Sequence, residues 1–253
     1  MKTLGLIPAR YASTRFPGKP LAEIAGKSMI QRVYEQALKA KLLTDVVVAT
    51  DDDRIFRHVQ SFGGKCVMTN PNHPSGTDRC YEAALNTGKK FDLIVNIQGD
   101  EPFMNPENID ALVQVFNQKD IHISTLICPL IDAESILSKD VVKVVINKNS
   151  DALYFSRFPI PFLRNQSLDN WLEMNNFYQH LGIYAYQFET LKQLVELQPS
   201  TLEKAESLEQ LRWLEAGFSI HTIAVAKTLP GIDTPQDLMK AEDYLKNNSN
   251  GNQ

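Results

Sequence analysis

Short apolar runs alternate with helical periodicity along the first half of the chain. Continuous apolar segments at 4–7 and 46–49 are typical of strands buried on both faces of a parallel sheet. Between them, apolar positions from Met29 to Leu38 recur every three or four residues and predict an amphipathic helix that begins near Ser28. The alternation continues with an expected helix at 53–62, a strand at 65–68, a helix at 78–87 and a strand at 93–98. This order predicts an α/β fold with a mainly parallel central sheet and right-handed crossovers.

The pattern changes after about residue 120. Segments rich in β-formers follow at 123–128, 141–146 and 153–157, and residues 156–176 then combine prolines, asparagines and aromatic clusters. We interpret this stretch as an inserted lobe or a subunit-contact arm. The chain then returns to a strand at 181–186, helices near 189–197 and 207–216, a strand at 220–225 and a helix from Pro235. We expect a single domain over 1–246, to which 150–205 contribute a smaller lobe, and a disordered polar tail at 247–253.

The composition narrows the class of protein. The 253 residues carry a net charge of −4, which argues against a nucleic-acid or membrane-surface partner. The first ten residues show no signal-peptide pattern, and no apolar run approaches the roughly 18 residues of a membrane-spanning helix. We therefore expect a cytoplasmic protein.

A cationic loop follows the first predicted strand. It carries Arg10, Arg15 and Lys19, with Ser13 among them. Ligands of open α/β sheets bind at the carboxyl ends of the strands, where cations and backbone N–H groups can hold a polyphosphate. The spacing matches neither a P-loop nor a dinucleotide-binding fingerprint. An ordinary solvated surface loop is the alternative interpretation.

Two aspartates are candidate metal ligands. Asp100 follows the predicted strand at 93–98, in V-N-I-Q-G-D-E-P, and would face the cationic loop. Asp233 precedes the last predicted helix, in G-I-D-T-P-Q-D-L. One or two carboxylates with phosphate oxygens and water suit Mg²⁺. Alternatively, Asp100 is a turn or helix-capping residue, and Asp233 or Thr234 caps the last helix.

Two further groups of residues suggest ligand contacts. In H-P-S-G-T-D-R, Ser75, Gly76 and Thr77 offer hydrogen bonds to a base or ribose and Arg79 adds a cation, although Ser75 or Thr77 could simply cap a helix. The segments 154–157, 180–186 and 208–212 offer a polyhydroxy acid a cation for its carboxylate and polar groups for its hydroxyls. Here the alternatives are core packing for Tyr184 and Tyr186, and a solvated helix face for Glu209 and Gln210.

Nine segments together resemble the CMP-Kdo synthetases, the 3-deoxy-manno-octulosonate (Kdo) cytidylyltransferases. In order, they are P-A-R-Y-A-S-T-R-F-P-G-K-P-L, V-A-T-D-D, H-P-S-G-T-D-R, V-N-I-Q-G-D-E-P, V-K-V-V, A-L-Y-F-S-R, H-L-G-I-Y-A-Y, L-E-Q-L-R and D-T-P-Q-D-L. The resemblance runs from Ile7 to Leu238. It implies a Rossmann-like nucleotide-diphospho-sugar transferase fold with a small sugar-binding and dimerisation lobe, and a homodimer. It also implies that CTP and Kdo react with Mg²⁺ to give CMP-Kdo and pyrophosphate, for bacterial lipopolysaccharide.

The resemblance also implies roles for individual residues. Arg10, Arg15 and Lys19 would bind the triphosphate, and Asp100 and Asp233 would hold Mg²⁺. Catalysis would depend on Lys19, Asp100, Asp233 and Arg10. The remaining CTP contacts would come from Pro8, Ala9, Ser13, Ser75, Gly76, Thr77 and Arg79, and the sugar pocket would be lined by Gln98, Arg157, His180, Tyr184, Glu209 and Gln210.

One position departs from the family pattern. Gln179 precedes His180, where many members have a basic residue. If that residue contacts the sugar, a related acidic sugar such as 8-amino-Kdo or sialic acid is the alternative substrate. A nucleotide-binding regulatory protein with a degenerate transferase fold is the alternative outside enzymes.

Overall fold

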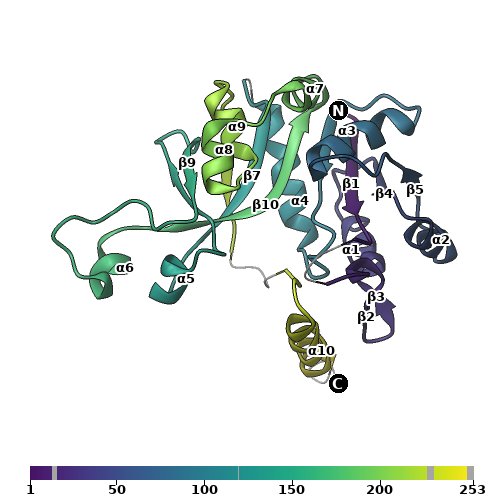
Figure 1. The fold of residues 1–253 in the computed structure, drawn as a ribbon, viewed down its shortest axis with the longest axis horizontal. Helices are drawn as coiled ribbons and strands as arrows, with labels where there is room; N and C mark the ends of the chain where they lie inside the picture. Colours follow the sequence, from purple (N-terminus) through teal and green to yellow (C-terminus); the bar gives the residue numbers. More distant parts are fainter. Residues whose placement is uncertain (13–15, 119, 227–230, 250–253) are drawn as a thin grey trace. The chain divides into compact units, whose positions relative to one another are not determined.

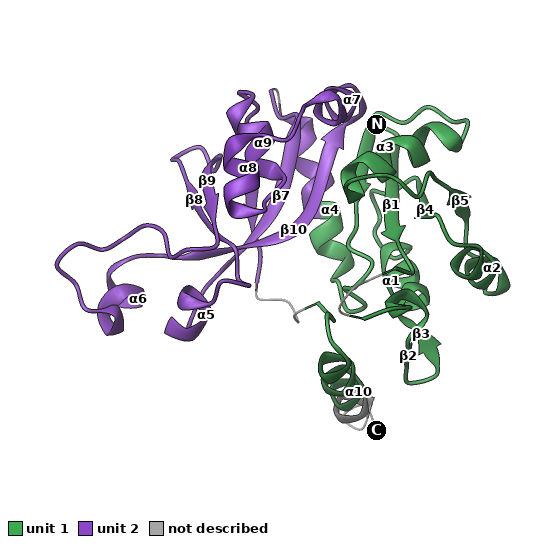
Figure 2. Cartoon of the chain, viewed as in Figure 1, with its two compact units in different colours: residues 1–110, 228–253 green, residues 111–227 purple. Residues whose placement is uncertain are grey.

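The computed structural model describes residues 1–12, 16–118, 120–226 and 231–249 (Figure 1). They form two compact units, Met1–Asp110 with Thr228–Gln253 and Ala111–Lys227 (Figure 2). The smaller lobe expected over 150–205 therefore lies within a larger unit that begins at Ala111. Across the described ranges, no helix combines the length and apolar character needed to span a bilayer.

The first unit is built on four parallel strands. β1 (Thr3–Ala9) pairs with β6 (Leu93–Asn96) on one side and with β4 (Asp45–Thr50) on the other, and β4 pairs with β5 (Cys66–Met68). In this register Leu6 lies opposite both Val47 and Asn96. The strand–helix alternation of the sequence thus gives the expected parallel sheet, and its carboxyl ends share one edge.

Side-chain caps fix where the helices of this sheet begin. Ser28 Oγ accepts from Gln31 N at the start of α1 (Met29–Ala37), and Asp52 caps α2 (Asp53–Ser61). Ser75 Oγ accepts from Asp78 N at 3.2 Å, so α3 (Gly76–Asn86) begins two residues before the expected start at 78. Each cap satisfies a backbone N–H group that has no partner within the helix.

The remaining elements of the first unit pack around a small apolar cluster. They are η1 (Lys19–Leu21), the hairpin of β2 (Glu23–Ile24) and β3 (Lys27–Ser28), and α10 (Pro235–Ser249). Ile24, Met29, Ile232 and Ala241 are buried together, with Phe103 and Leu238 against them. α10 runs to Ser249, so residues 247–249 are helical although we expected a disordered tail from 247.

The second unit has a mixed sheet. β7 (Ile123–Pro129) pairs antiparallel with β10 (Tyr178–Gln187) and parallel with β11 (His221–Ala224). β8 (Lys143–Ile146) pairs antiparallel with β10 and with β9 (Ala152–Ser156).

Short helices accompany this sheet. They are α5 (Ala133–Leu137), η3 (Leu168–Asn170), α6 (Trp171–Met174), α7 (Phe188–Glu196), α8 (Thr201–Glu206) and α9 (Gln210–Glu215), while α4 (Pro106–Gln114) continues into η2 (Val115–Asn117). The single helix expected at 207–216 is therefore shorter and is preceded by α8, which we did not predict.

Candidate active site

A pocket of about 450 Å³ lies at the carboxyl edge of the first unit's parallel sheet. The ends of β1 and β6 and the beginning of α3 form its walls. The residues that line it are Pro8, Ala9, Arg10, Ala12, Lys19, Pro20, Pro74, Ser75, Gly76, Arg79, Gln98, Gly99 and Asp100. The structure thus brings together most of the residues that the sequence suggests for CTP, from the end of β1 through Lys19 and from the start of α3.

Three of the predicted CTP residues are not among these. Ser13 and Arg15 lie outside the described residues. Thr77 is buried in the first turn of α3 and does not line the pocket. The pocket edge formed by 75–79 is therefore made by the residues on either side of Thr77.

A glycine allows the two strand ends of the pocket to lie close together. A Cβ atom at Gly99 would lie 2.9 Å from the carbonyl oxygen of Pro8, closer than real Cβ atoms approach backbone. Because both residues line the pocket, a side chain at 99 would push its two walls apart. Gly99 was not among the predicted site residues, although a glycine directly after a buried strand is a signal for such a close approach.

Lys19 connects the two candidate metal ligands. Its Nζ lies 2.7 Å from Asp100 Oδ2 and 3.1 Å from Asp233 Oδ1. The side chain of Lys19 is 16% exposed, and those of the aspartates are 28% and 43% exposed. Two carboxylates therefore converge on one cation at the rim of a polar pocket, a donor set of hard oxygens that fits Mg²⁺.

The alternative interpretations of these aspartates hold in part. Asp100 lies in a turn, where Glu101 N donates to Gln98 O at 3.4 Å, and Asn105 Oδ1 accepts from Glu107 N at the start of α4. Thr234 Oγ1 accepts from Asp237 N at the start of α10, so Thr234 caps the last helix as that alternative expects. The turn and the cap leave the contacts of both carboxylates with Lys19 in place. No group of three or more His, Cys, Asp or Glu side chains in the described ranges is arranged to hold a metal, so a bound ion would need oxygens from substrate or water as well.

Glu101 has a perturbed carboxyl group next to Asp100. Burial, and then the negative charge of Asp100, raise the pKa of Glu101 to about 8. At neutral pH this carboxyl group is mainly protonated and adds little negative charge beside Asp100.

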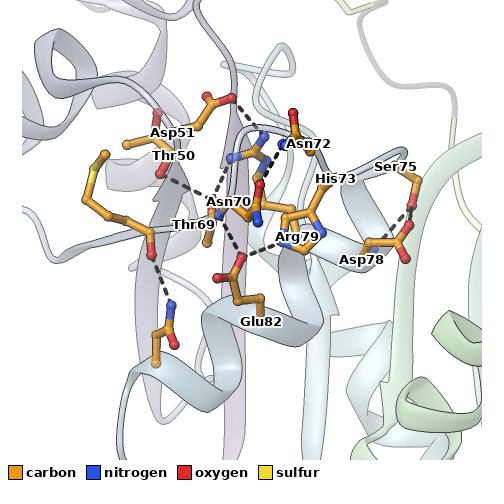
Figure 3. A network of polar contacts seen from close by, with 12 residues as sticks. Thr50, Asp51, Thr69, Asn70, Asn72, His73, Ser75, Asp78, Arg79 and Glu82 are labelled. Carbon is orange, nitrogen blue, oxygen red and sulfur yellow. Dashed lines mark hydrogen bonds and ion pairs between the residues drawn. The ribbon is translucent and has the colours of Figure 1, made fainter.

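Arg10 is held at the pocket by polar contacts with the segment that precedes α3. Its Nη2 donates to the backbone oxygen of His73. The ring Nε2 of His73 in turn contacts Oε2 of Glu82 on α3 (Figure 3). Glu82 also accepts from Asn70 N at 2.8 Å. The carbonyl orients the guanidinium without neutralising it, so Arg10 keeps its charge for an anionic ligand.

Arg79 lies deeper in the same network. It is fully buried, and its guanidinium donates to Thr69 Oγ1 and, at 3.1 Å, to Asp51 Oδ2 (Figure 3). Burial lowers the pKa of Arg79, and the charge of Asp51 opposes this shift. Ser75, in turn, is the N-cap of α3, as the capping alternative expects. Arg79 therefore ties α3 to the ends of β4 and β5, with two of its nitrogens already committed to protein oxygens.

Asp51 was not among the predicted site residues. It follows β4 directly, in V-A-T-D-D, and so lies at the same sheet edge as Asp100. That position was the available signal, because the carboxyl ends of parallel strands meet.

The second unit contains five of the six predicted sugar residues. His180 and Tyr184 lie on β10 with ring centroids 5.3 Å apart, Arg157 follows β9, and Glu209 and Gln210 begin α9. The sixth residue, Gln98, belongs to the first unit and lines the pocket described above. Gln210 is buried, so the solvated-face alternative is wrong for this residue.

Tyr184 carries a buried hydroxyl group. It packs edge-on against Trp213, with ring centroids 5.0 Å apart, so the core-packing alternative describes its ring correctly. Its hydroxyl group has no hydrogen-bond partner among the described residues, and an unsatisfied buried group costs about 1–3 kcal/mol. Burial, with the charge of Glu209 as a smaller cause, raises the pKa of Tyr184, so the phenol stays protonated and can donate to a ligand.

His180 is held in one neutral tautomer. Thr125 Oγ1 donates its single proton to the carbonyl oxygen of Ile183 at 2.8 Å, and it lies 3.0 Å from His180 Nε2. Nε2 must therefore carry the proton and donate to Thr125, which leaves Nδ1 as an acceptor. Burial lowers the pKa of His180 to about 3, so the ring stays neutral near physiological pH.

The buried imidazole predicts an acid-sensitive fold. In the unfolded chain a histidine has a pKa of about 6.5, so unfolding takes up a proton as the pH falls below that value. His180 should therefore remove about 2 kcal/mol from the free energy of unfolding between about pH 7 and about pH 5. Urea denaturation of His180→Asn should show a correspondingly shallower acid slope than the wild type. His122→Asn, which removes an exposed imidazole, is the matched control and should keep the wild-type slope; equal slopes for all three proteins would contradict the prediction.

Gln179 lies away from these residues. Successive side chains of a strand point to opposite faces, and the Oε1 atom of Gln179 lies 3.9 Å from Cys128 Sγ. His180 is on the other face, packed against Phe155 and Tyr184. Gln179 therefore faces away from His180 and Tyr184, two of the predicted sugar residues.

Comparisons with known proteins agree on one family. The cytidylyltransferase family model matches residues 4–223. The 3-deoxy-manno-octulosonate cytidylyltransferase of Bacteroides thetaiotaomicron is 54% identical over 253 residues, which cover 98% of this chain and 100% of the relative. The protein of the same description from Porphyromonas gingivalis is 45% identical over 248 residues and 97% of both chains.

Solved structures support the same assignment. The structure of CMP:2-keto-3-deoxy-manno-octonic acid synthetase complexed with CTP matches with a TM-score of 0.91 and 44% identity, over 98% of this chain and 100% of that one. A cytidylyltransferase from Leptospira borgpetersenii matches with a TM-score of 0.62 at 18% identity, which supports the fold alone. The predicted transferase fold is confirmed, and the chain belongs to the cytidylyltransferase family, within the group of 3-deoxy-manno-octulosonate cytidylyltransferases.

Proposed function

We propose that this chain is a nucleotidyltransferase that converts CTP and 3-deoxy-manno-octulosonate into CMP-Kdo and pyrophosphate. The observation that carries this function is the match, over nearly the whole chain, to a synthetase of that description in complex with CTP. The pocket of the first unit adds the chemistry, because Lys19, Asp100 and Asp233 meet at its rim and Arg10 lines its wall. A degenerate, regulatory relative would be expected to lack one of these groups.

The reaction is a displacement at phosphorus. The anomeric hydroxyl of the sugar attacks the α-phosphorus of CTP, the bond from that phosphorus to the bridging oxygen breaks, and pyrophosphate leaves. No covalent intermediate with the protein is required. Catalysis then consists of positioning the two substrates and neutralising the charge that develops on the phosphates.

The residues of the first unit suit the nucleotide. Lys19 and Arg10 offset negative charge on the triphosphate and on the departing pyrophosphate. Backbone groups of Pro8, Ala9 and Gly76 lie at the pocket wall, where they can select the base. Asp100 and Asp233 would hold Mg²⁺, which would supply Lewis-acid stabilisation of phosphate oxygens when bound.

The residues of the second unit suit an acidic sugar. Arg157 offers a cation to the carboxylate, Tyr184 a hydroxyl donor, and His180 Nδ1 an acceptor for a sugar hydroxyl. Glu209 and Gln210 add polar groups at the start of α9. A homodimer and a cytoplasmic location remain predictions from the sequence.

Pyrophosphate release tests the function directly. The protein with CTP and Mg²⁺ should release pyrophosphate rapidly with Kdo, and more slowly with 8-amino-Kdo or sialic acid. The matched control replaces CTP by ATP at the same concentration. Absence of pyrophosphate release with Kdo would contradict the proposal, and a faster reaction with another acidic sugar would reassign the substrate.

A further inference from the structure

Lys143 is a buried lysine with no donor left for a substrate. It begins β8, is 0% exposed, and its Nζ donates to the carbonyl oxygens of Ser138, Val141 and Arg157 at 2.7, 2.6 and 2.5 Å. An ammonium group has three N–H donors, so these three bonds use all of them. Burial lowers the pKa of Lys143, as desolvation of a cation requires. A buried cation that binds only backbone oxygens serves to hold those segments in place.

Arg157 is held through both its backbone and its side chain. Its carbonyl is bound by Lys143, and its backbone N donates to Glu206 Oε2 at 2.9 Å. Its guanidinium donates to three further carbonyl oxygens, those of Glu206 at 2.8 Å, Lys139 at 3.1 Å and Ser207 at 3.3 Å. Two of the five guanidinium N–H donors remain, and none of these contacts neutralises the charge. Arg157 is thus a pre-oriented cation ready to bind an anion.

Glu206 connects the end of β9 with the end of α8. It is the last residue of α8, and its Oε1 accepts from Ser156 Oγ at 2.8 Å. Ser207, with a φ of +52°, then turns the chain toward Glu209. On the other side of Lys143, the backbone oxygen of Val142 accepts from His180 N at 2.9 Å. The contacts of the Lys143 and Glu206 side chains themselves thus converge on Ser156 and Arg157.

We propose that Lys143 and Glu206 are positioning residues for the acidic sugar, which act by holding the Arg157 guanidinium ready for the sugar carboxylate. This inference rests on the proposed function, since it takes Kdo as the anion that Arg157 binds. Neither residue contacts the sugar itself. Their loss should therefore weaken the use of Kdo and leave the use of CTP unchanged.

Steady-state kinetics with each substrate varied in turn tests this role. Lys143→Met and Glu206→Leu should each raise the KM for Kdo at least about tenfold, with the KM for CTP changed less than about twofold. Glu206→Gln keeps one acceptor and should restore most of the affinity for Kdo. Lys148→Met, which removes an exposed lysine near the end of the same strand, is the matched control and should behave as the wild type. Circular dichroism checks the fold of each variant, and Glu206→Leu carries the test if Lys143→Met does not fold.

A double variant separates positioning from general damage. If Lys143 acts through Arg157, Lys143→Met should add almost nothing to the KM for Kdo in an Arg157→Ala background. Additive effects, or an equal rise in the KM for CTP, would overturn the inference. Wild-type protein that releases no pyrophosphate with Kdo would overturn the proposed function instead. An active wild type with unchanged variants would overturn this inference alone.

Discussion

Asp100→Asn should lower the turnover number of this enzyme at least about 100-fold, which corresponds to about 3 kcal/mol of transition-state stabilisation. Asp100 Oδ2 lies 2.7 Å from Lys19 Nζ at the rim of the pocket, and the proposed Mg²⁺ site needs its negative charge. An amide of the same shape keeps the side-chain volume but cannot neutralise Lys19 or bind the metal as an anion. The measurement is pyrophosphate release at saturating CTP and Kdo.

The matched control is Asp53→Asn, which makes the same chemical change at an exposed position in the first turn of α2 and should keep the wild-type rate. A second test is Lys19→Ala, which removes the cation that contacts Asp100 and should reduce turnover as strongly as Asp100→Asn. Near-normal turnover of Asp100→Asn, with circular dichroism unchanged, would remove Asp100 from the catalytic residues.

Arg79→Met should destabilise the protein by about 3 kcal/mol, because it leaves a largely buried carboxylate without its partner. Arg79 is fully buried and donates to Asp51, whose side chain is 17% exposed, and to Thr69. These contacts hold α3 against the ends of two strands, so their loss should weaken the fold before it affects the chemistry. Urea denaturation monitored by circular dichroism measures the change.

The control for Arg79 is an exposed ion pair. Lys27 lies 2.7 Å from Glu35 with side chains that are 45% and 38% exposed, so Lys27→Met should cost less than about 1 kcal/mol. The sequence interpretation gave Arg79 a direct contact with CTP. A normal urea midpoint for Arg79→Met, together with a raised KM for CTP, would support that direct contact and contradict the structural role.

The parallel sheet and the pocket at its carboxyl edge were accessible from the sequence. Short apolar runs followed by polar residues located the carboxyl ends of β1, β4 and β6, and strands that run in parallel bring those ends to one edge. The pocket there contains Arg10, Lys19 and Asp100 as expected, and also Gln98, which we expected to line the sugar pocket. Local patterns located Arg10, Gln98 and Asp100 because these residues closely follow β1 or β6.

The sequence also contained signals for helix α8 and for a buried Lys143 that our predictions did not use. Helix α8 begins with a capping box, in which Ser200 Oγ accepts from Glu203 N and the carboxylate of Glu203 accepts from Ser200 N. The spacing S-x-x-E is a recognised helix start, and it separates α8 from α9. The motif V-K-V-V likewise placed Lys143 in an apolar run, which indicates a buried lysine that needs partners.

The hydrogen-bond partners of Lys143 and Arg79 could not be predicted from the sequence. The carbonyl oxygens that bind Lys143 come from residues 138, 141 and 157, and the contacts of Arg79 come from 51 and 69. Some of these partners are near in the chain and others, such as Asp51, are not, and the pattern of residue types along the sequence does not encode which oxygen will face a given side chain. Arg79 lines the pocket and also binds Asp51 and Thr69, and its charge alone does not distinguish a contact with CTP from a structural role.

The contact of Lys19 with two aspartates also bears on the protein before any substrate arrives. Asp100 and Asp233 share Lys19 as an internal counterion, so their mutual repulsion is reduced. The protonated state of Glu101 at neutral pH removes a further negative charge from the same edge. A polyanion that approaches this edge therefore meets less negative charge than the three acidic side chains would otherwise present.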